Sequence, residues 1–187
     1  MSLHTNTSQI LSGWKPSEPA QEALRQAFLG YLAAREDACA RACTPGHITA
    51  AVVIFNPERT HTLLTLHRRL GAWLQLGGHC EETDHTLADT AVREVREESG
   101  ISNASIEAQP FHLDVHPVTC SLGIPTRHFD IRFRAFVPME AQLTSNHESV
   151  DLRWWRVDEL PENAMPDIPA LITTAINSIS STEKYPA

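Results

Sequence analysis

Three glutamates, Glu94, Glu97 and Glu98, stand close together near the middle of the chain, and we call them the glutamate triad. Their i, i+3, i+4 spacing places the three side chains on one side of an α-helix, because successive residues turn by about 100°. Like charges four residues apart destabilise a helix by about 0.2–0.5 kcal/mol, so something should offset the repulsion. Arg93 and Arg96 with solvent could do so, as could a hard divalent cation, which binds carboxylate oxygens and keeps several waters.

The segment around the triad predicts the elements that position it. Its apolar residues recur at the three- and four-residue steps of one helix face: Leu87, Ala88, Ala91, Val92 and Val95. Asp84 is the predicted N-cap of this helix, and Gly100 is placed to end it in the left-handed conformation. The glycine pair Gly77-Gly78 lets the backbone approach a ligand closely, and the Gly78 carbonyl can point at a metal. A glycine loop before a helix of about four turns favours a bound divalent cation, rather than arginines and solvent, as the partner that offsets the repulsion within the triad.

The stretch from Arg93 to Ile101, REVREESGI, resembles the second half of the Nudix box, Arg-Glu-apolar-any-Glu-Glu-any-Gly-apolar, at every specified position. The first half departs from the pattern. His79 and His85 stand where the family places a Gly and a Glu, while Gly78 and Asp84 lie one residue earlier, as a one-residue insertion would produce. The position of the leading Glu is then lost or taken by one of three acids, Asp84, Glu82 or Glu81.

The resemblance implies an α/β fold, an α/β/α sandwich around a mixed β-sheet. It also implies a pyrophosphohydrolase that acts on a nucleoside diphosphate linked to another group and uses Mg²⁺ or Mn²⁺. The glutamate triad would hold the ion, assisted by the Gly78 carbonyl, and Arg93 would orient the glutamates or the loop by ion pairing. For the general base we name Glu98 first and Glu148, in a later loop, second, because some family members supply a base from there.

Two other functions are compatible with these residues. A Nudix-fold module that binds or senses a ligand without turnover is favoured by the displaced first half of the motif. The intact triad argues against it, because a pure binder has no need of three convergent carboxylates. A scaffolding protein with an acidic helix is the third reading, and the glycine pair argues against it. The motif is shared across the family, so it does not select the substrate.

Two later segments predict strands with one polar face. The residues that share this face are His112, Asp114 and His116 in 111–117, and His128, Asp130, Arg132 and Arg134 in 128–136. If the strands pair, these residues form one polar wall, which faces either solvent or a substrate. The candidates for substrate contact are His116, His128, Asp130 and Arg132. A second metal on His116 and His128 is a less favoured reading than hydrogen bonding to substrate.

The rest of the chain predicts a single hydrolase domain with an added element. We divide the 187 residues into an N-terminal extension, 1–46, and a Nudix domain, 47–187. Residues 1–16 show little pattern and predict a loose lead-in, and Ser17 is the expected N-cap of an amphipathic helix that begins at Pro19. This extension could pack on the domain, cover the site or mediate a homodimer. Further strands are predicted over 48–55, 60–67, 73–76 and 150–157, and a closing helix over 169–179.

The bulk composition restricts the class of protein. The net charge of −8 argues against strong nucleic-acid binding, while bound cations would still admit an anionic small-molecule substrate. The sequence shows no apolar run of about eighteen residues and no signal peptide, which predicts a cytoplasmic protein. The four cysteines, Cys39, Cys43, Cys80 and Cys120, are expected to be reduced thiols. We expect no zinc site, because no further ligands stand at a spacing typical of zinc.

Overall fold

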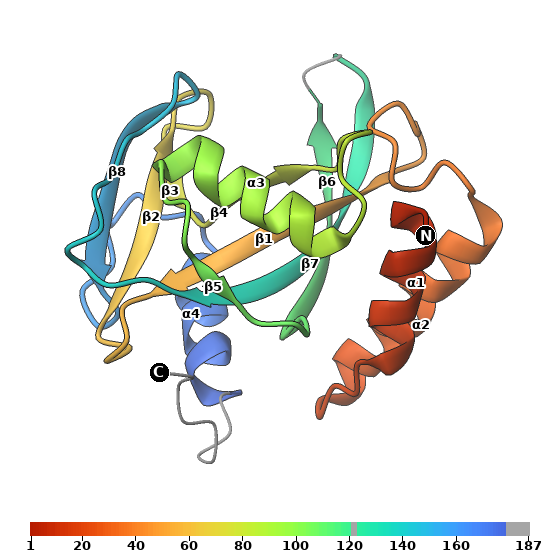
Figure 1. Cartoon of the computed structure of the whole chain (residues 1–187), viewed down its shortest axis with the longest axis horizontal. Coiled ribbons are helices and arrows are strands. Elements are labelled where there is room, and N and C mark those ends of the chain that lie inside the picture. Colours follow the sequence, from red (N-terminus) through yellow and green to blue (C-terminus); the bar gives the residue numbers. More distant parts are fainter. Residues whose placement is uncertain (121–122, 179–187) are drawn as a thin grey trace.

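The computed structural model describes residues 1–120 and 123–178. Its strands form one eight-stranded sheet with helices on both faces, which confirms the predicted α/β/α sandwich (Figure 1). The helices are α1 (Leu3–Gly13), α2 (Pro19–Ala34), α3 (Leu87–Ser99) and α4 (Ile168–Asn177). The strands are β1 (His47–Phe55), β2 (His61–His67), β3 (Ala72–Leu74), β4 (Leu76–His79), β5 (Ser105–Ile106), β6 (His112–Thr119), β7 (Pro125–Phe136) and β8 (Ser149–Arg156).

Strand β1 is the centre of the sheet. It pairs in parallel with β7 and antiparallel with β2 and β4, so the sheet is mixed, as predicted. Strands β5 and β6 pair with β7, and β3 and β8 pair with β2. The register places His47 opposite His128, and Thr49 lies opposite both Asp130 and His79. All nine residues of β1 are buried, as expected for a strand covered on both faces.

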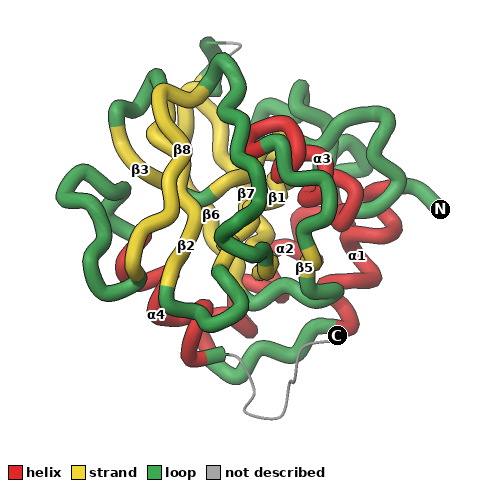
Figure 2. The backbone as a smooth tube through the Cα atoms, turned by 60° about the vertical axis from the view of Figure 1, so that its left-hand side comes forward, coloured by secondary structure: helices red, strands yellow, loops and turns green. Residues whose placement is uncertain are grey.

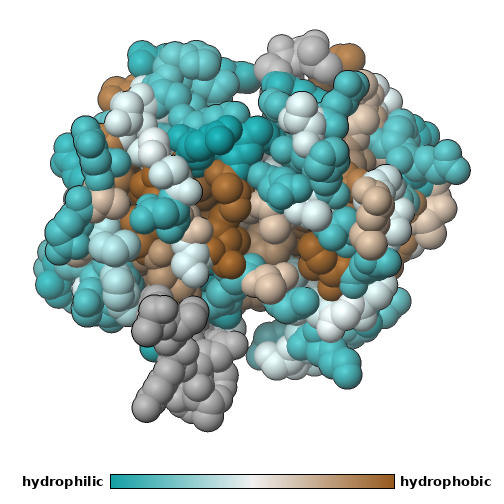
Figure 3. All heavy atoms as spheres, in the orientation of Figure 1, coloured by the Kyte–Doolittle hydropathy of each residue, from teal (hydrophilic) through white to brown (hydrophobic). Residues whose placement is uncertain are grey.

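Each face of the sheet carries its own core, because successive residues of a strand point to opposite sides. One core joins Ile48, Ala50 and Val52 of β1 to α3, α1 and α2. The other joins Val53 and Phe55 of β1 to α4. Figure 2 shows the strands between these two groups of helices. Viewed from the side of α3, polar residues cover most of the surface, and apolar residues appear in patches across its middle (Figure 3).

The N-terminal residues are more ordered than the sequence predicted. Residues 1–16 contain helix α1, which buries Leu11 completely, so the expectation of a loose lead-in was wrong. Helix α2 begins at Pro19 as predicted, but its N-cap is Glu18 rather than Ser17, and no side chain caps it. Both amide atoms of Gln21 bond to the backbone of Leu113, which ties α2 to β6. The N-terminal helices therefore pack on the sheet, the first of the three arrangements considered.

The C-terminal elements follow the sequence closely. Helix α4 forms within about two residues of the predicted range and buries Ile168, Leu171, Ile172 and Ala175. The predicted end of this helix, Ile179, lies outside the described residues. Among the described residues, no helix is long and apolar enough to cross a membrane.

Candidate functional site

Helix α3 begins and ends on strong capping signals. Thr86 is the N-cap, and Thr86 and Asp89 form a reciprocal capping box, with hydrogen bonds of 3.1 Å and 2.8 Å. The amide of Leu87 donates to the side-chain oxygen of Asn6 in α1 at 2.9 Å, which satisfies another free donor of the first turn. Gly100 ends the helix with a φ of 74°, as predicted. The predicted N-cap, Asp84, was wrong, because its carboxylate is bound elsewhere.

Arg93 holds Asp84 and the loop before α3. Its Nη2 atom donates to Asp84 at 2.9 Å and to the His79 carbonyl at 2.6 Å. Its Nη1 atom donates to Glu94 at 2.9 Å and to Glu97 at 3.3 Å. Burial alone would raise the pKa of Asp84, but hydrogen bonds from Arg93, the Glu81 amide and Thr90 hold it below its usual value. Of the three acids that could replace the leading Glu of the motif, the structure joins Asp84 most tightly to Arg93.

The glycine pair lies in strand β4 rather than in a loop, and both residues touch the triad. The Gly77 amide donates to Glu98 Oε2 at 2.9 Å. Gly77 also has a φ of 147°, and a Cβ there would lie 2.5 Å from the Ala50 carbonyl of β1. A Cβ on Gly78 would lie 2.6 Å from Glu94 Oε1. Glycine at position 78 therefore leaves room for the Glu94 carboxylate, and glycine at position 77 lets β4 pack closely against β1.

We expect Gly78→Ala to perturb the site more than the fold. The added methyl group meets the Glu94 carboxylate, which must move away, whereas the backbone of Gly78 needs no positive φ. The substitution should lower turnover by about tenfold or more, because small displacements of catalytic groups have such effects. The melting temperature should fall only slightly. Unchanged turnover in a well-folded Gly78→Ala protein would show that the position of Glu94 is unimportant.

The three carboxylates of the triad lie in different environments. Glu94 is 13% exposed and Glu97 is 47% exposed at the side chain, while Glu98 is buried. Burial raises the pKa of Glu94, and the nearby Arg93 opposes that rise. Burial also raises the pKa of Glu98 to about 8, and the charges of Glu94, Glu148 and Glu97 add to the effect, against the Gly77 hydrogen bond. Within the described residues, Glu98 has no cationic side chain at ion-pair distance.

The raised pKa of Glu98 predicts a pH-dependent stability in metal-free buffer. Its usual value is 4.5 and its folded value is about 8, so the folded state favours the protonated acid. This preference stabilises the folded state fully below about pH 4.5, and the stabilisation is lost as the pH rises through 8. Its contribution to the free energy of unfolding is at most about 1.4 kcal/mol for each unit by which the pKa is raised. The melting temperature of the wild type should therefore fall from pH 5 to pH 9 more steeply than that of Glu98→Gln. Parallel curves for the two proteins would contradict this account.

A match to a protein-family model over most of the chain decides the family. Residues 45–174 match the family model of the NUDIX domain. The chain belongs to the Nudix family. It is a Nudix-type hydrolase, an enzyme acting on phosphoanhydride bonds, and the family generally uses divalent metals. A comparison with curated protein sequences gave no match.

Solved structures show the same fold at low sequence identity. The E. coli dihydroneopterin triphosphate pyrophosphohydrolase has a TM-score of 0.57 and 21% identity, covering 70% of this chain and 96% of that chain. A binary complex of the C. elegans Ap4A hydrolase has a TM-score of 0.52 and 18% identity, covering 70% and 95%. The NUDIX domain of Shewanella oneidensis NrtR, complexed with ADP ribose, has a TM-score of 0.53 and 20% identity, covering 79% and 96%.

In this Nudix fold, Glu148 lies in the loop before β8, on the side of Glu98. Its side chain is 59% exposed, and its charge lies close enough to raise the pKa of Glu98. The Glu148 carbonyl accepts a hydrogen bond from the Arg68 amide at 2.8 Å, which holds the loop against the end of β2. Glu148 is exposed, and its ion-pair contact, with His147, is long at 4.0 Å. It therefore remains a candidate base beside Glu98.

The polar wall forms, and it is buried at Asp130, Arg132 and Arg134, whereas Asp114 and His116 are 35% and 39% exposed at the side chain. Strands β6 and β7 pair as predicted, with Asp114 opposite Asp130 and His116 opposite His128. Arg132 is only 3% exposed and binds Asp130 at 2.8 Å. Of the two alternatives considered for the wall, a solvated face does not hold for Asp130 and Arg132.

The buried part of this wall lies on the sheet face opposite α3. Arg132 contacts Asp167, at the start of α4, at 3.2 Å, and Arg134 donates to the Ala175 carbonyl within α4. Asp130 also accepts a hydrogen bond from Thr49 at 2.9 Å. The substrate contact predicted for His116, His128, Asp130 and Arg132 stays a prediction, and the structure does not bring these residues onto the triad's side of the sheet.

A cavity of about 680 Å³ lies away from the triad. Residues that line it include Trp14, Gln21, Phe111 and Arg134, from the N-terminal helices and the end of the sheet nearest α4. None of its described lining residues belongs to α3. We therefore base the function on the triad and not on the cavity.

Proposed function

We propose that this Nudix hydrolase is a Mg²⁺- or Mn²⁺-dependent pyrophosphohydrolase that cleaves a diphosphate linkage in a nucleoside diphosphate joined to another group. The observation that carries the proposal is a pair of carboxylates held against the glycine pair, the buried Glu98 and the partly buried Glu94, with Glu97 beside them on α3. The similar structures support this substrate class, because dihydroneopterin triphosphate, Ap4A and ADP ribose all contain linked phosphates.

The donor set fits a hard divalent ion. Carboxylate oxygens are the ligands that Mg²⁺ prefers. Arg93 pairs with Glu94, whereas the buried Glu98 has no cationic side chain at ion-pair distance among the described residues. Glu94, Glu97 and Glu98 would hold the ion, and the Gly78 carbonyl lies on the adjacent strand. When bound, the ion would neutralise charge on the phosphate oxygens and help to supply hydroxide.

Each residue of the site has a role in the proposal. Glu98 is the first candidate to accept the proton of the attacking water, in the carboxylate form that a bound cation would favour, and Glu148 is the second candidate. Arg93 is a positioning residue that ties the triad to Asp84 and β4. The water would attack phosphorus in line with the leaving phosphate group.

The proposal also covers the organisation of the chain. We treat residues 1–46 as an N-terminal extension and 47–187 as the Nudix domain. The substrate is a small molecule, since the charge of −8 disfavours nucleic acid. We assign no role in dimerisation to α1 and α2, whose apolar residues already pack against the sheet core.

A panel of nucleotide sugars, dinucleoside polyphosphates, nucleotide coenzymes and nucleoside triphosphates tests the function. The protein is first treated with a chelator, and Mg²⁺, Mn²⁺ or Zn²⁺ is then added back alone. We expect at least one compound to be cleaved at a phosphoanhydride bond with Mg²⁺ or Mn²⁺, and Glu97→Gln to weaken the metal response. Tight binding of panel compounds without any turnover would instead favour the ligand-binding module.

A further inference from the structure

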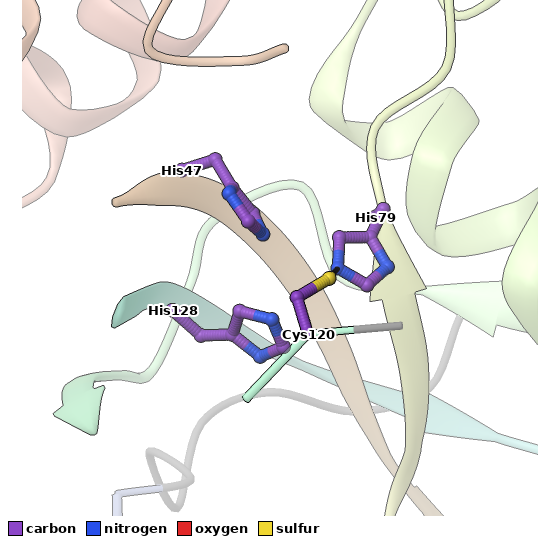
Figure 4. A group of neighbouring side chains, drawn as sticks. All are labelled: His47, His79, Cys120 and His128. Atoms are coloured by element: carbon purple, nitrogen blue, oxygen red, sulfur yellow. Dashed lines mark hydrogen bonds between the residues drawn. The ribbon is translucent and has the colours of Figure 1, made fainter. Parts of the chain in front are cut away.

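Three histidines and one cysteine point toward one centre away from the triad: His47, His79, Cys120 and His128 (Figure 4). One ligand atom from each residue lies within 4.8 Å of all the others. The four come from separate segments, since His47 opens β1, His79 ends β4, His128 lies in β7 and Cys120 follows β6. The β1–β7 register and the β1–β4 register place the three imidazoles on one face of the sheet.

The spacing of these groups is close to that of a tetrahedral metal site. The ring centroids of His47, His79 and His128 form a triangle with sides of 5.0, 5.1 and 4.9 Å. The Cys120 Sγ atom lies 3.5 Å from His79 Nε2. Ideal tetrahedral zinc, with Zn–N near 2.0–2.1 Å and Zn–S near 2.3 Å, requires an N···S separation of about 3.6 Å. Small side-chain rotations would therefore complete the site.

His47 gives an independent sign that a ligand belongs here. The residue is 1% exposed, yet its Nε2 atom has no hydrogen-bond partner among the described residues. Its other ring nitrogen, Nδ1, lies 3.3 Å from the Cys43 carbonyl and is placed to donate to it. This bond fixes the tautomer that leaves a lone pair on Nε2, as in most metal-bound histidines. The buried Nε2 of His128 lacks a partner in the same way.

The charges around the cluster are mixed. Burial lowers the pKa of both His79 and His128. The positive charge of Arg41 also contributes to both shifts and would oppose a bound cation. A Cys120 thiolate would offset that charge, and the carboxylate of Asp130 lies near His128.

We propose that His47, His79, His128 and Cys120 form a zinc site. Imidazole nitrogens with one thiolate suit zinc and not Mg²⁺, which prefers oxygen, and four protein ligands are typical of a structural ion. The ion would join β1, β4 and β7 at the end of the sheet where β1 begins and β4 ends. It would also fix the His79 backbone, whose carbonyl accepts the 2.6 Å bond from Arg93. The site thus holds in place the strand that carries Gly77 and Gly78.

Metal content tests the proposal directly. The full chain is produced without a histidine tag, in medium containing zinc, and its metals are measured by mass spectrometry after gel filtration. We expect about one zinc per chain in the wild type and in the matched control Cys39→Ser, which changes a cysteine outside the cluster. Cys120→Ser and His47→Gln should lose the ion, with the zinc dissociation constant raised by about 100-fold or more.

A second measurement covers the case in which the variants fail to fold. Metal-free wild type is titrated with Co²⁺, and its visible spectrum should show the bands of a tetrahedral ion with a thiolate ligand. Wild-type protein that binds no stoichiometric zinc, or a folded Cys120→Ser that keeps it, would overturn the proposal. So would a cobalt spectrum without thiolate or tetrahedral bands. None of these readouts uses hydrolysis, so their failure would leave the proposed function standing.

Discussion

Glu98→Gln should lower the turnover number by about 10²–10⁴-fold and change the Michaelis constant much less. This range is typical of a lost general base, and loss of a metal ligand would add to it. The fold should survive, because the amide oxygen of Gln can still accept the hydrogen bond from the Gly77 amide. The substitution also removes a buried carboxylate whose pKa burial raises to about 8. Steady-state kinetics at saturating Mg²⁺ provide the measurement.

Glu148→Gln is the matched control for this substitution. It makes the same chemical change on an exposed side chain in the loop before β8. If Glu98 is the base, Glu148→Gln should retain most of the turnover. A larger loss in Glu148→Gln than in Glu98→Gln would move the base to the later loop. Near-wild-type turnover in folded Glu98→Gln would refute the role of Glu98.

Arg93→Met should destabilise the protein by about 3–5 kcal/mol, the typical cost of leaving a buried charge without its partner. The Asp84 side chain is 4% exposed and that of Arg93 is 11% exposed, so water can replace little of this ion pair. The loss should be partly recovered in the double variant Arg93→Met, Asp84→Asn, because Asn is neutral and can still bond to Thr90. Urea unfolding of the four proteins in this cycle gives the coupling energy.

Arg96→Met is the control for Arg93→Met. Arg96 lies on the same helix but is exposed, so its removal should change stability by no more than about 0.5 kcal/mol. Additive effects of the Arg93 and Asp84 substitutions would show that the two residues act independently. Asp84 could then not be the residue that takes the place of the leading Glu of the motif.

The local pattern of the sequence predicted most of the elements. Helix α3, its end at Gly100 and the pairing of β6 with β7 followed from periodicity and from one glycine. The N-cap was placed two residues early because Asp84 and Thr86 are both good caps, and only the position of Arg93 decides between them. Helix α1 was missed because its sequence is mostly polar, and it is stabilised by packing against α2 and α3.

Contacts between distant segments could not be predicted from local pattern. The polar wall was correctly paired, but Asp167 and Ala175, which cover it, come from α4, far along the chain. The cluster of His47, His79, Cys120 and His128 was missed for the same reason, since zinc spacing is recognised when ligands are neighbours in sequence. Pairing the predicted strands β1 and β7 in parallel could have indicated part of the cluster, because that pairing brings His47 beside His128.

The most direct test of the account is the position of manganese in crystals soaked in a saturating Mn²⁺ solution. Anomalous diffraction locates Mn²⁺ independently of any substrate and distinguishes it from zinc. We predict Mn²⁺ within about 2.0–2.3 Å of carboxylate oxygens of Glu94, Glu97 or Glu98, near the distances of hard cations. Mn²⁺ found only elsewhere, for example at the histidine–cysteine cluster, would contradict the metal-dependent site on α3.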